Sequence, residues 1–507
     1  MPTRPLFAGA ILLLTQVALA ATPLTFTRHD IDSRNPGQVS EGMNVGDLDG
    51  DGRPDIIEGG EDALVWYHDP DWTPAVIGSG FRYSAGAMVF VRDMDGDGRL
   101  DVVTGRYPVN NTGARETLWF GNTPGGWVEH LLSPTAFCHD LAFADFDGDG
   151  HADAVCDDQF TATIDILTSP ADPTMPWTST VIDQRHPMGA AAADIDGDGR
   201  ADVVVGRAWY RNEASGAWTR YPITDLVPQT DTFFVDHSKI SVLDLDGDGR
   251  PDVFATIFAD SRESHVFAFL APVDPLRQPW TPVEVDAGPL WGVHSQGVGD
   301  FDGSGAVQIM VGEPFSAGFG FGNNPSPEVY VYRLLGSARD AGAWERTLVD
   351  RIGTFEAQVT DVDGDGLSDI VGHEGNPAVQ PDPRAQGRIS WWQSTVPRPS
   401  APPPGTPPPG SPPPAGGSGR CSGTSMACAC TGDGVAGCVG ERLPRPVARS
   451  LRHACRLLGH ASGRASVRRR MTRVLGAVAW RAEKASRRGR LSPRCTHAIV
   501  TLVGAAG

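Results

Sequence analysis

Asp47-Leu48-Asp49-Gly50-Asp51-Gly52-Arg53-Pro54-Asp55 is the stretch of sequence that decides the fold. Its pattern, Asp-x-Asp-Gly-Asp-Gly-x-x-Asp, is complete in six places, at residues 47–55, 93–101, 145–153, 194–202, 244–252 and 361–369. A degenerate seventh copy begins at Asp300, where Ser304 and Gln308 replace two of the acids. Successive copies begin 46 to 61 residues apart. Repeats of this period indicate a chain built from similar supersecondary units.

Each acidic stretch lies between two segments that have the pattern of β-strands. Alternating residues precede it, as in 240–243, and a β-branched run follows it, as in 202–205. A third segment carries aromatic residues, and a fourth has an aromatic residue with an aliphatic residue five positions later, as in Trp218 and Ile223. The fourth pattern occurs six times after acidic stretches and a seventh time near the N-terminus, at Phe26 and Ile31.

The position of this seventh copy predicts how the architecture closes. After residue 392 the chain enters a Pro-rich segment, so the last repeat has no fourth strand of its own. We therefore expect residues 24–31 to supply the outer strand of the unit built by residues 355–396. A closed ring leaves no sheet edge exposed. The prediction is an all-β fold, a seven-bladed β-propeller over residues 23–396.

These repeats resemble the FG-GAP/VCBS-type repeat family, calcium-binding β-propellers like the N-terminal region of integrin alpha chains. The resemblance rests on the acidic stretch between the first two strands of each unit, and it covers about residues 23–396. It implies that calcium ions stabilise the blades and take no part in catalysis. It says little about function, because propellers host many activities.

The acidic stretches have the chemistry of calcium sites. Carboxylates at positions 1, 3, 5 and 9 and a backbone carbonyl at position 7 suit a hard cation, and the glycines allow the turn around it. An EF-hand would need flanking helices and a Glu at position 12, which only Glu58 of the first copy provides. Solvated turns without an ion are the other interpretation. We predict about six structural calcium sites, with weak or no binding at residues 300–308. The predicted metal-binding residues are Asp47, Asp49, Asp51, Arg53, Asp55, Asp93, Asp95, Asp97, Arg99, Asp101, Asp145, Asp147, Asp149, His151, Asp153, Asp194, Asp196, Asp198, Arg200, Asp202, Asp244, Asp246, Asp248, Arg250, Asp252, Asp361, Asp363, Asp365, Leu367 and Asp369.

Polar residues five to eight positions before the acidic stretches form a second group of candidates. The first strand of a blade lines the central channel, so these side chains should lie near the axis on the face opposite the acidic loops. They could bind a transition metal or perform acid–base chemistry, whereas a water-filled channel would also explain their polarity. The group is Glu41, His139, His186, His237, His294 and Glu356, and the candidate catalytic residues are His139, His237, His294 and Glu356.

The two ends of the chain differ from the repeats in composition. Residues 1–20 have an apolar stretch after Arg4 and a small-residue cleavage pattern, which predicts a secretory signal. Residues 397–419 contain three Pro triplets and predict an extended linker. Residues 420–507 carry a net charge of +14 and six of the eight cysteines, whereas the remainder carries −34. We expect this basic tail to be disordered, with a folded disulfide module as the alternative.

Aromatic and cysteine residues of the repeats leave two further questions open. Tyr67, Tyr210 and Trp392 of the third strands could stack on sugar rings or pack between blades. An exported protein could form a disulfide between Cys138 and Cys156, although hairpin pairing would place Cys156 nearer Ala142.

Composition excludes some classes of function. The acidic balance of the chain argues against nucleic-acid binding, and no run of 18 apolar residues is present that could span a membrane. We expect a secreted or cell-surface monomer that binds carbohydrate or protein. The alternative is a sugar-processing lyase or dehydratase acting at the His/Glu group, and a third possibility is a purely structural surface protein.

Overall fold

The computed structural model divides the chain into two compact units, residues 1–399 and 400–507, and every described residue belongs to the first. The signal segment, linker and tail expected at residues 1–20, 397–419 and 420–507 lie outside the described residues, as do Glu41 and His186. The structure describes residues 23–32, 42–60, 62–83, 88–108, 113–158, 160–185, 188–225, 237–257, 264–314, 324, 326–374 and 388–395.

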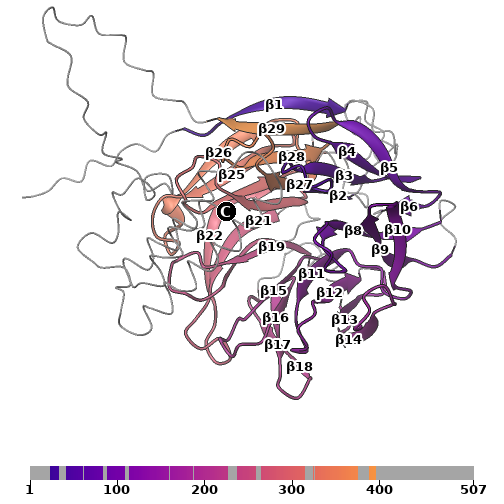
Figure 1. Ribbon diagram of the computed structural model, residues 1–507. Helices are drawn as coiled ribbons and strands as arrows, with labels where there is room; N and C mark the ends of the chain where they lie inside the picture. Colours follow the sequence, from indigo (N-terminus) through magenta and orange to yellow (C-terminus); the bar gives the residue numbers. More distant parts are fainter. Residues whose placement is uncertain are drawn as a thin grey trace, which may run out of the picture. The chain divides into compact units, whose positions relative to one another are not determined.

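The described residues form seven antiparallel sheets, the blades of a β-propeller (Figure 1). The first strands are β2 (Gly42–Gly46), β7 (Val89–Arg92), β11 (Asp140–Ala144), β15 (Ala190–Ala193), β19 (Ser238–Leu243), β23 (Ser295–Gly299) and β27 (Phe355–Thr360). The second strands are β3 (Asp55–Gly59), β8 (Asp101–Tyr107), β12 (Asp153–Asp158), β16 (Asp202–Val205), β20 (Asp252–Ile257), β24 (Gln308–Gly312) and β28 (Asp369–His373).

The third and fourth strands complete each blade. The third strands are β4 (Ala63–His68), β9 (Glu116–Thr123), β13 (Thr163–Thr168), β17 (Ala208–Asn212), β21 (Ser264–Leu270), β25 (Val329–Leu334) and β29 (Ile389–Thr395). The fourth strands are β5 (Thr73–Ser79), β10 (Gly126–Ser133), β14 (Thr178–Asp183), β18 (Trp218–Pro222), β22 (Thr281–Leu290), β26 (Trp344–Asp350) and β1 (Thr25–Asp32). Blade two has one extra strand, β6 (Arg82–Tyr83), and a 3₁₀ helix, η1 (Ala341–Ala343), precedes β26.

The N-terminal strand closes the ring, as the sequence predicts. β1 pairs antiparallel with β29, from Thr25 opposite Thr395 to Asp32 opposite Ile389 (Figure 1). Blade seven therefore has the strand order β1-β29-β28-β27 and joins the two ends of the repeat region. β1 takes the place of the missing fourth strand and pairs with the edge of β29, which would otherwise be open to pairing with another chain.

Hydrophobic side chains fill the space between neighbouring blades. Each face of a sheet packs against the neighbouring blade. The central strands therefore bury apolar residues on both faces. One such layer joins blades two and three and contains Val103, Trp119, Leu132, Leu141, Ala154 and Leu167. Cys138 and Cys156 lie in the same layer and form a disulfide, although strand pairing places Cys156 opposite Leu141.

A repeated hydrogen bond latches neighbouring blades together. In each case an aromatic residue of a third strand donates to an aspartate in the preceding blade's fourth strand. The latches are Tyr67 to Asp32 at 3.3 Å, Tyr210 to Asp183 at 2.8 Å, Tyr332 to Asp286 at 2.7 Å and Trp392 to Asp350 at 2.8 Å. Tyr67, Tyr210 and Trp392 are buried, so they pack between blades and the sugar-stacking alternative for them is wrong.

The aspartates that accept these hydrogen bonds also occupy a regular position in the sequence. Each one directly follows the aliphatic residue of the fourth-strand pattern, as Asp32 follows Ile31 and Asp350 follows Val349. Burial, reinforced by the acceptor Asp183, raises the pKa of Tyr210, so its hydroxyl remains a donor at neutral pH.

Candidate functional site

The first acidic loop shows how nine residues fold around a possible ion. Asp47 accepts hydrogen bonds from the backbone N–H groups of Gly50 and Gly52, at 2.8 and 3.0 Å, through its two oxygens. Both glycines have positive φ, 79° and 95°, which a residue with a side chain adopts only with strain. Asp49 accepts from the N–H of Asp51 at 3.0 Å. The loop is therefore held by its own carboxylates, and the two bonds from glycine N–H groups to the first aspartate recur in the loops beginning at Asp93, Asp145, Asp244 and Asp361.

The last aspartate of each loop is buried and begins the second strand. Asp55 is 2% exposed and accepts from the N–H groups of Leu48 in the loop and Asp69 after the third strand, each at 3.0 Å. This arrangement ties the loop to the segment that follows the third strand, at the same end of the blade. Burial raises the pKa of Asp101, Asp202 and Asp252 to about 6. A cation beside these carboxylates would compensate the lost hydration that causes the shift.

Three of the four predicted carboxylates come together in these loops. In four loops, oxygens from positions 1, 3 and 9 lie within 4.8 Å of one another, and the position-5 acid is not part of the group. Examples are Asp47, Asp49 and Asp55; Asp93, Asp95 and Asp101; Asp145, Asp147 and Asp153; and Asp194, Asp196 and Asp202.

Two loop carboxylates leave an oxygen that a cation could satisfy. Asp194 Oδ1 and Asp246 Oδ1 are buried and accept no hydrogen bond in the described residues. A buried acceptor without a partner costs free energy of about 1–3 kcal/mol. The donor set is carboxylate oxygen, which calcium prefers, so the loop residues fit this ion.

Some loop acids already have a cationic neighbour. Arg211 of β17 lies 2.5 Å from Asp196 and 2.9 Å from Asp198, and Arg339 lies 2.6 Å from Asp246. An ion bound in these two loops would therefore compete with, or displace, a guanidinium group.

The degenerate seventh loop holds its acids with side chains of the protein itself. Gln308 stands where the other loops have the buried aspartate, and its amide nitrogen donates to Asp302 Oδ1 at 2.5 Å and to Ser304 Oγ at 3.3 Å. Arg333, which is 2% exposed, pairs with Asp302 Oδ2 at 2.6 Å. The guanidinium of Arg333 and the amide N–H group of Gln308 thus stabilise the carboxylate of Asp302, as a calcium ion would stabilise the carboxylates of the other loops. No motif in the sequence singles out Arg333.

A buried charged cluster lies at the opposite ends of the first strands. Lys239 of β19 donates to both carboxylate oxygens of Glu356 of β27, each at 3.0 Å. Its ammonium is also 3.7 Å from Asp140 Oδ1 of β11, and His294 Nδ1 lies 3.3 Å from Glu356 Oε1. One lysine therefore joins blades three, five and seven. We call Lys239, Asp140, Glu356, His139 and His294 the axial cluster.

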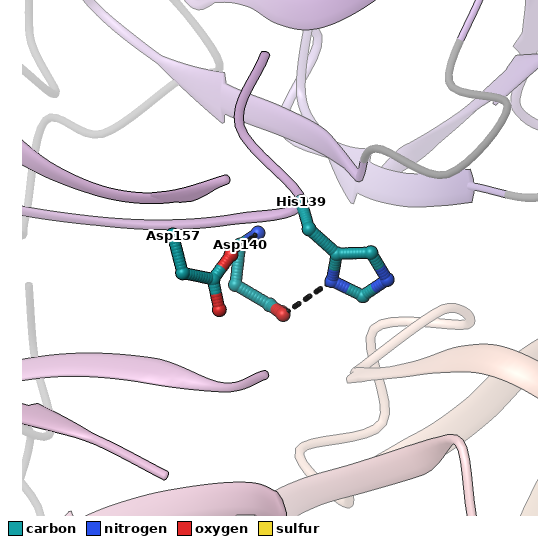
Figure 2. A group of neighbouring side chains, drawn as sticks. All are labelled: His139, Asp140 and Asp157. Atoms are coloured by element: carbon teal, nitrogen blue, oxygen red, sulfur yellow. Dashed lines mark hydrogen bonds and ion pairs between the residues drawn. The ribbon is translucent and has the colours of Figure 1, made fainter. Parts of the chain in front are cut away.

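Figure 2 shows the blade-three part of this cluster, with the imidazole of His139 directed at Asp140. His139 Nδ1 lies 2.6 Å from Asp140 Oδ2, and Asp157 of β12 accepts from the backbone N–H of Asp140 at 2.6 Å. Oxygen and nitrogen atoms of these three side chains lie within 4.8 Å, so they form another group that could hold a metal. However, the carboxylate of Asp140 already contacts His139 Nδ1, and the ammonium group of Lys239 lies 3.7 Å from it.

Burial and ion pairing set the protonation states of the cluster. Burial opposes the charge on Lys239, but Asp140 and Glu356 outweigh it and raise the pKa of Lys239. Burial also opposes ionisation of Asp140, yet Lys239 and His139 hold the pKa of Asp140 well below its usual range. Burial raises the pKa of Asp157 well above its usual range. Within the cluster Lys239 is therefore an ammonium and Asp140 a carboxylate, whereas ionisation of the neighbouring Asp157 is disfavoured.

A small cavity borders this cluster. Its volume is about 160 Å³, and its lining includes Asp140, Lys239, His294, Gln296 and Glu356. Gln296 is engaged with blade five, since its amide nitrogen donates to Ser241 Oγ at 2.9 Å. The cavity is polar and has room for a few water molecules.

The structure brings together only some of the predicted axial residues. His139, His294 and Glu356 belong to the axial cluster. His237 is buried in a β-bridge with Met188 and is not among the cavity residues. Asp140, Asp157 and Lys239 were missed, although Lys239 is one of two lysines in the chain.

Two repeat families match the chain in the regions of these loops. The FG-GAP-like repeat matches residues 47–104 and 93–156, and the FG-GAP repeat matches residues 187–218. The chain carries FG-GAP repeats. No curated protein matches this FG-GAP propeller. Among solved structures, it is similar to the crystal structure of the V. cholerae biofilm matrix protein Bap1, with 15% identity over 74% of this chain and 70% of that chain and a TM-score of 0.33.

The FG-GAP propeller contains no helix in its described residues that is long and apolar enough to cross a membrane.

Proposed function

We propose that this chain is an exported, calcium-loaded β-propeller that acts as a binding module for carbohydrate or protein at the cell surface. The observation that carries the proposal is the set of acidic loops in which carboxylates at positions 1, 3 and 9 meet within 4.8 Å. Bare carboxylates so close repel one another, and calcium is the cation whose oxygen coordination fits them. Its role in this proposal is to hold each turn at the edge of its blade.

The disulfide between Cys138 and Cys156 supports export. Structural disulfides form and persist in oxidising compartments and are rare in the cytosol. Calcium sites of modest affinity are also suited to the outside of a cell, where millimolar calcium fills them.

The axial cluster favours binding over catalysis. Lys239 is held as an ammonium by two carboxylates, so it is a poor general base, and His139 is engaged with Asp140. The cavity of about 160 Å³ is also smaller than the roughly 300–1,000 Å³ of ordinary ligand pockets. A sugar-processing enzyme at this position is therefore the weaker candidate.

The test combines stability and binding of the full chain. Thermal unfolding and retention on immobilised polysaccharides or cell surfaces are measured in about 1 mM calcium and in chelator. We expect chelation to lower the melting temperature and to reduce binding. The Asp95→Asn variant should lose part of the calcium response, whereas Asp302→Asn, in the loop that holds its own acids, should keep it. Unchanged melting and binding in chelator would contradict the proposal, and turnover of a sugar substrate that His294→Ala abolishes would favour the enzyme.

A further inference from the structure

An arginine and an exposed phenylalanine lie against two buried aromatic residues between blades two and three. Tyr107 ends β8, Arg115 directly precedes β9, Phe137 lies between β10 and β11, and Phe160 lies in the turn after β12. All four belong to connections at the ends of strands away from the acidic loops, because each loop directly precedes the second strand of its blade. We call these residues the Arg115 platform.

The platform is built by stacking. The guanidinium carbon of Arg115 lies 4.1 Å from the ring centroid of Phe160 and 5.3 Å from that of Tyr107. Phe137 meets Phe160 edge-on at 5.4 Å and Tyr107 at 6.0 Å. Cation–π and edge-to-face contacts of this kind keep both the cation and the rings in place.

A buried aspartate fixes the turn that presents Phe160. Asp158 is 1% exposed and accepts from the N–H groups of Phe160 at 2.9 Å and Thr161 at 3.0 Å through one oxygen. Its other oxygen accepts from the N–H of Phe137 at 3.0 Å. The same carboxylate thus sets the position of two of the aromatic residues.

Exposure and charge distinguish this platform from the core. Phe160 remains 45% exposed despite its contacts with Arg115 and Phe137. Arg115 has no carboxylate partner among the described residues, and its Nε is buried without a hydrogen bond. By contrast, the neighbouring Arg106 pairs with Glu116 at 3.0 Å and Glu129 at 2.7 Å. Within the described part of the chain, a guanidinium without a carboxylate partner thus lies beside an exposed ring, which is complementary to an anionic ligand.

We propose that the Arg115 platform binds a carboxylate-bearing pyranose of an acidic polysaccharide. The proposal rests on the binding function proposed above and specifies its ligand class. The apolar C–H face of the sugar stacks on Phe160, and the planar carboxylate accepts hydrogen bonds from the Arg115 guanidinium.

The negative charge of the acidic loops does not prevent this binding. The platform and the nearest acidic loop lie at opposite ends of β12, whose six residues span about 20 Å. The Debye length at physiological salt is about 8 Å, so the loop charges are largely screened at the platform.

The experiment measures binding of a short oligogalacturonide, a chain of uronate sugars, to the full chain in calcium by titration calorimetry. A neutral oligosaccharide of the same length is the comparison ligand. The variants are Arg115→Gln and Phe160→Ala, and Arg277→Gln is the matched control because it removes one exposed arginine elsewhere. Thermal unfolding checks that each variant is folded. Since a hydrogen bond to a charged group contributes about 1.5–3 kcal/mol, Arg115→Gln should weaken binding by at least about tenfold.

The two arms separate this inference from the broader proposal. Uronate binding that Arg115→Gln and Phe160→Ala weaken, and Arg277→Gln does not, supports the platform. Equal weakening by Arg277→Gln would show general charge attraction and overturn it. Equal binding of the neutral ligand, or binding only to a protein, would also overturn the platform while leaving the binding module standing. Failure of calcium to stabilise the chain would instead contradict the function proposed above.

Discussion

Replacing Lys239 with Met tests whether the axial cluster holds the ring of blades together. Lys239 is 6% exposed and joins Glu356 and Asp140, which belong to blades seven and three. Removing one partner of a buried ion pair costs about 3–5 kcal/mol, because the other charge stays buried without compensation. For a cooperative unit of about 370 residues, with an unfolding entropy near 2.1 cal/mol/K per residue, that cost lowers the melting temperature by about 4–6 °C.

The assay is differential scanning calorimetry of the full chain in calcium. The double variant Lys239→Met/Glu356→Gln is the decisive control, since it removes the buried carboxylate charge together with the ammonium. Asp140 keeps hydrogen-bond donors in His139 and the Gly189 N–H, so the double variant should recover most of the lost stability. A single variant that melts within about 1 °C of the natural protein, or a double variant less stable than the single one, would refute the argument.

Three further predictions concern other parts of the propeller. Replacing Cys138 and Cys156 with Ser opens a loop with a sequence separation of 18 residues, which should cost about 3 kcal/mol and appear as a lower denaturant midpoint. The change Tyr67→Phe removes the latch to Asp32 at the ring closure and should cost about 1–2 kcal/mol in chemical unfolding. Burial lowers the pKa of His373 to about 4, so the unfolded chain binds a proton at a higher pH than the folded chain does. The stability of the fold therefore falls as pH drops from about 6.5 towards 4. The variant His373→Gln lacks this effect, so its stability relative to the natural protein should improve on acidification.

Each of these predictions has an outcome that contradicts it. Reducing agent that leaves the midpoint of the natural protein unchanged would show that the disulfide contributes nothing. The latch at Tyr67 would be unimportant if Tyr67→Phe unfolds at the same midpoint as a Phe substitution at the half-buried Tyr221 of β18. A constant stability difference between His373→Gln and the natural protein, measured between about pH 7 and pH 4, would mean that His373 titrates normally.

Local features of the fold were predictable from the sequence. The acidic loops are made by hydrogen bonds within nine residues, so the spacing of Asp and Gly is enough to identify them. The closing strand was predictable because Phe26 and Ile31 repeat a pattern present in the other blades. The disulfide was expected only as one alternative, since strand pairing alone does not decide it.

Contacts between distant segments were not predictable in the same way. The partners Lys239 and Glu356 are 117 residues apart, and neither belongs to the repeated pattern. The Arg115 platform comes from three different connections, β8–β9, β10–β11 and β12–β13, so no spacing in the sequence brings it together. His237 lies just before β19 in a bridge with Met188 and does not line the cavity beside the axial cluster, so a role for it stays a prediction. Arg333 could have been suspected only as a basic residue in the one blade whose loop has lost two acids.

The calcium content of the full chain tests the central claim most directly. The chain is dialysed to equilibrium at about 1 mM calcium, and bound metal is measured by elemental analysis against the dialysis buffer. The account predicts about six calcium ions per chain, one for each complete acidic stretch, and one fewer in the Asp95→Asn variant. No bound calcium above the buffer, or an unchanged content when Asp95 is replaced, would contradict it.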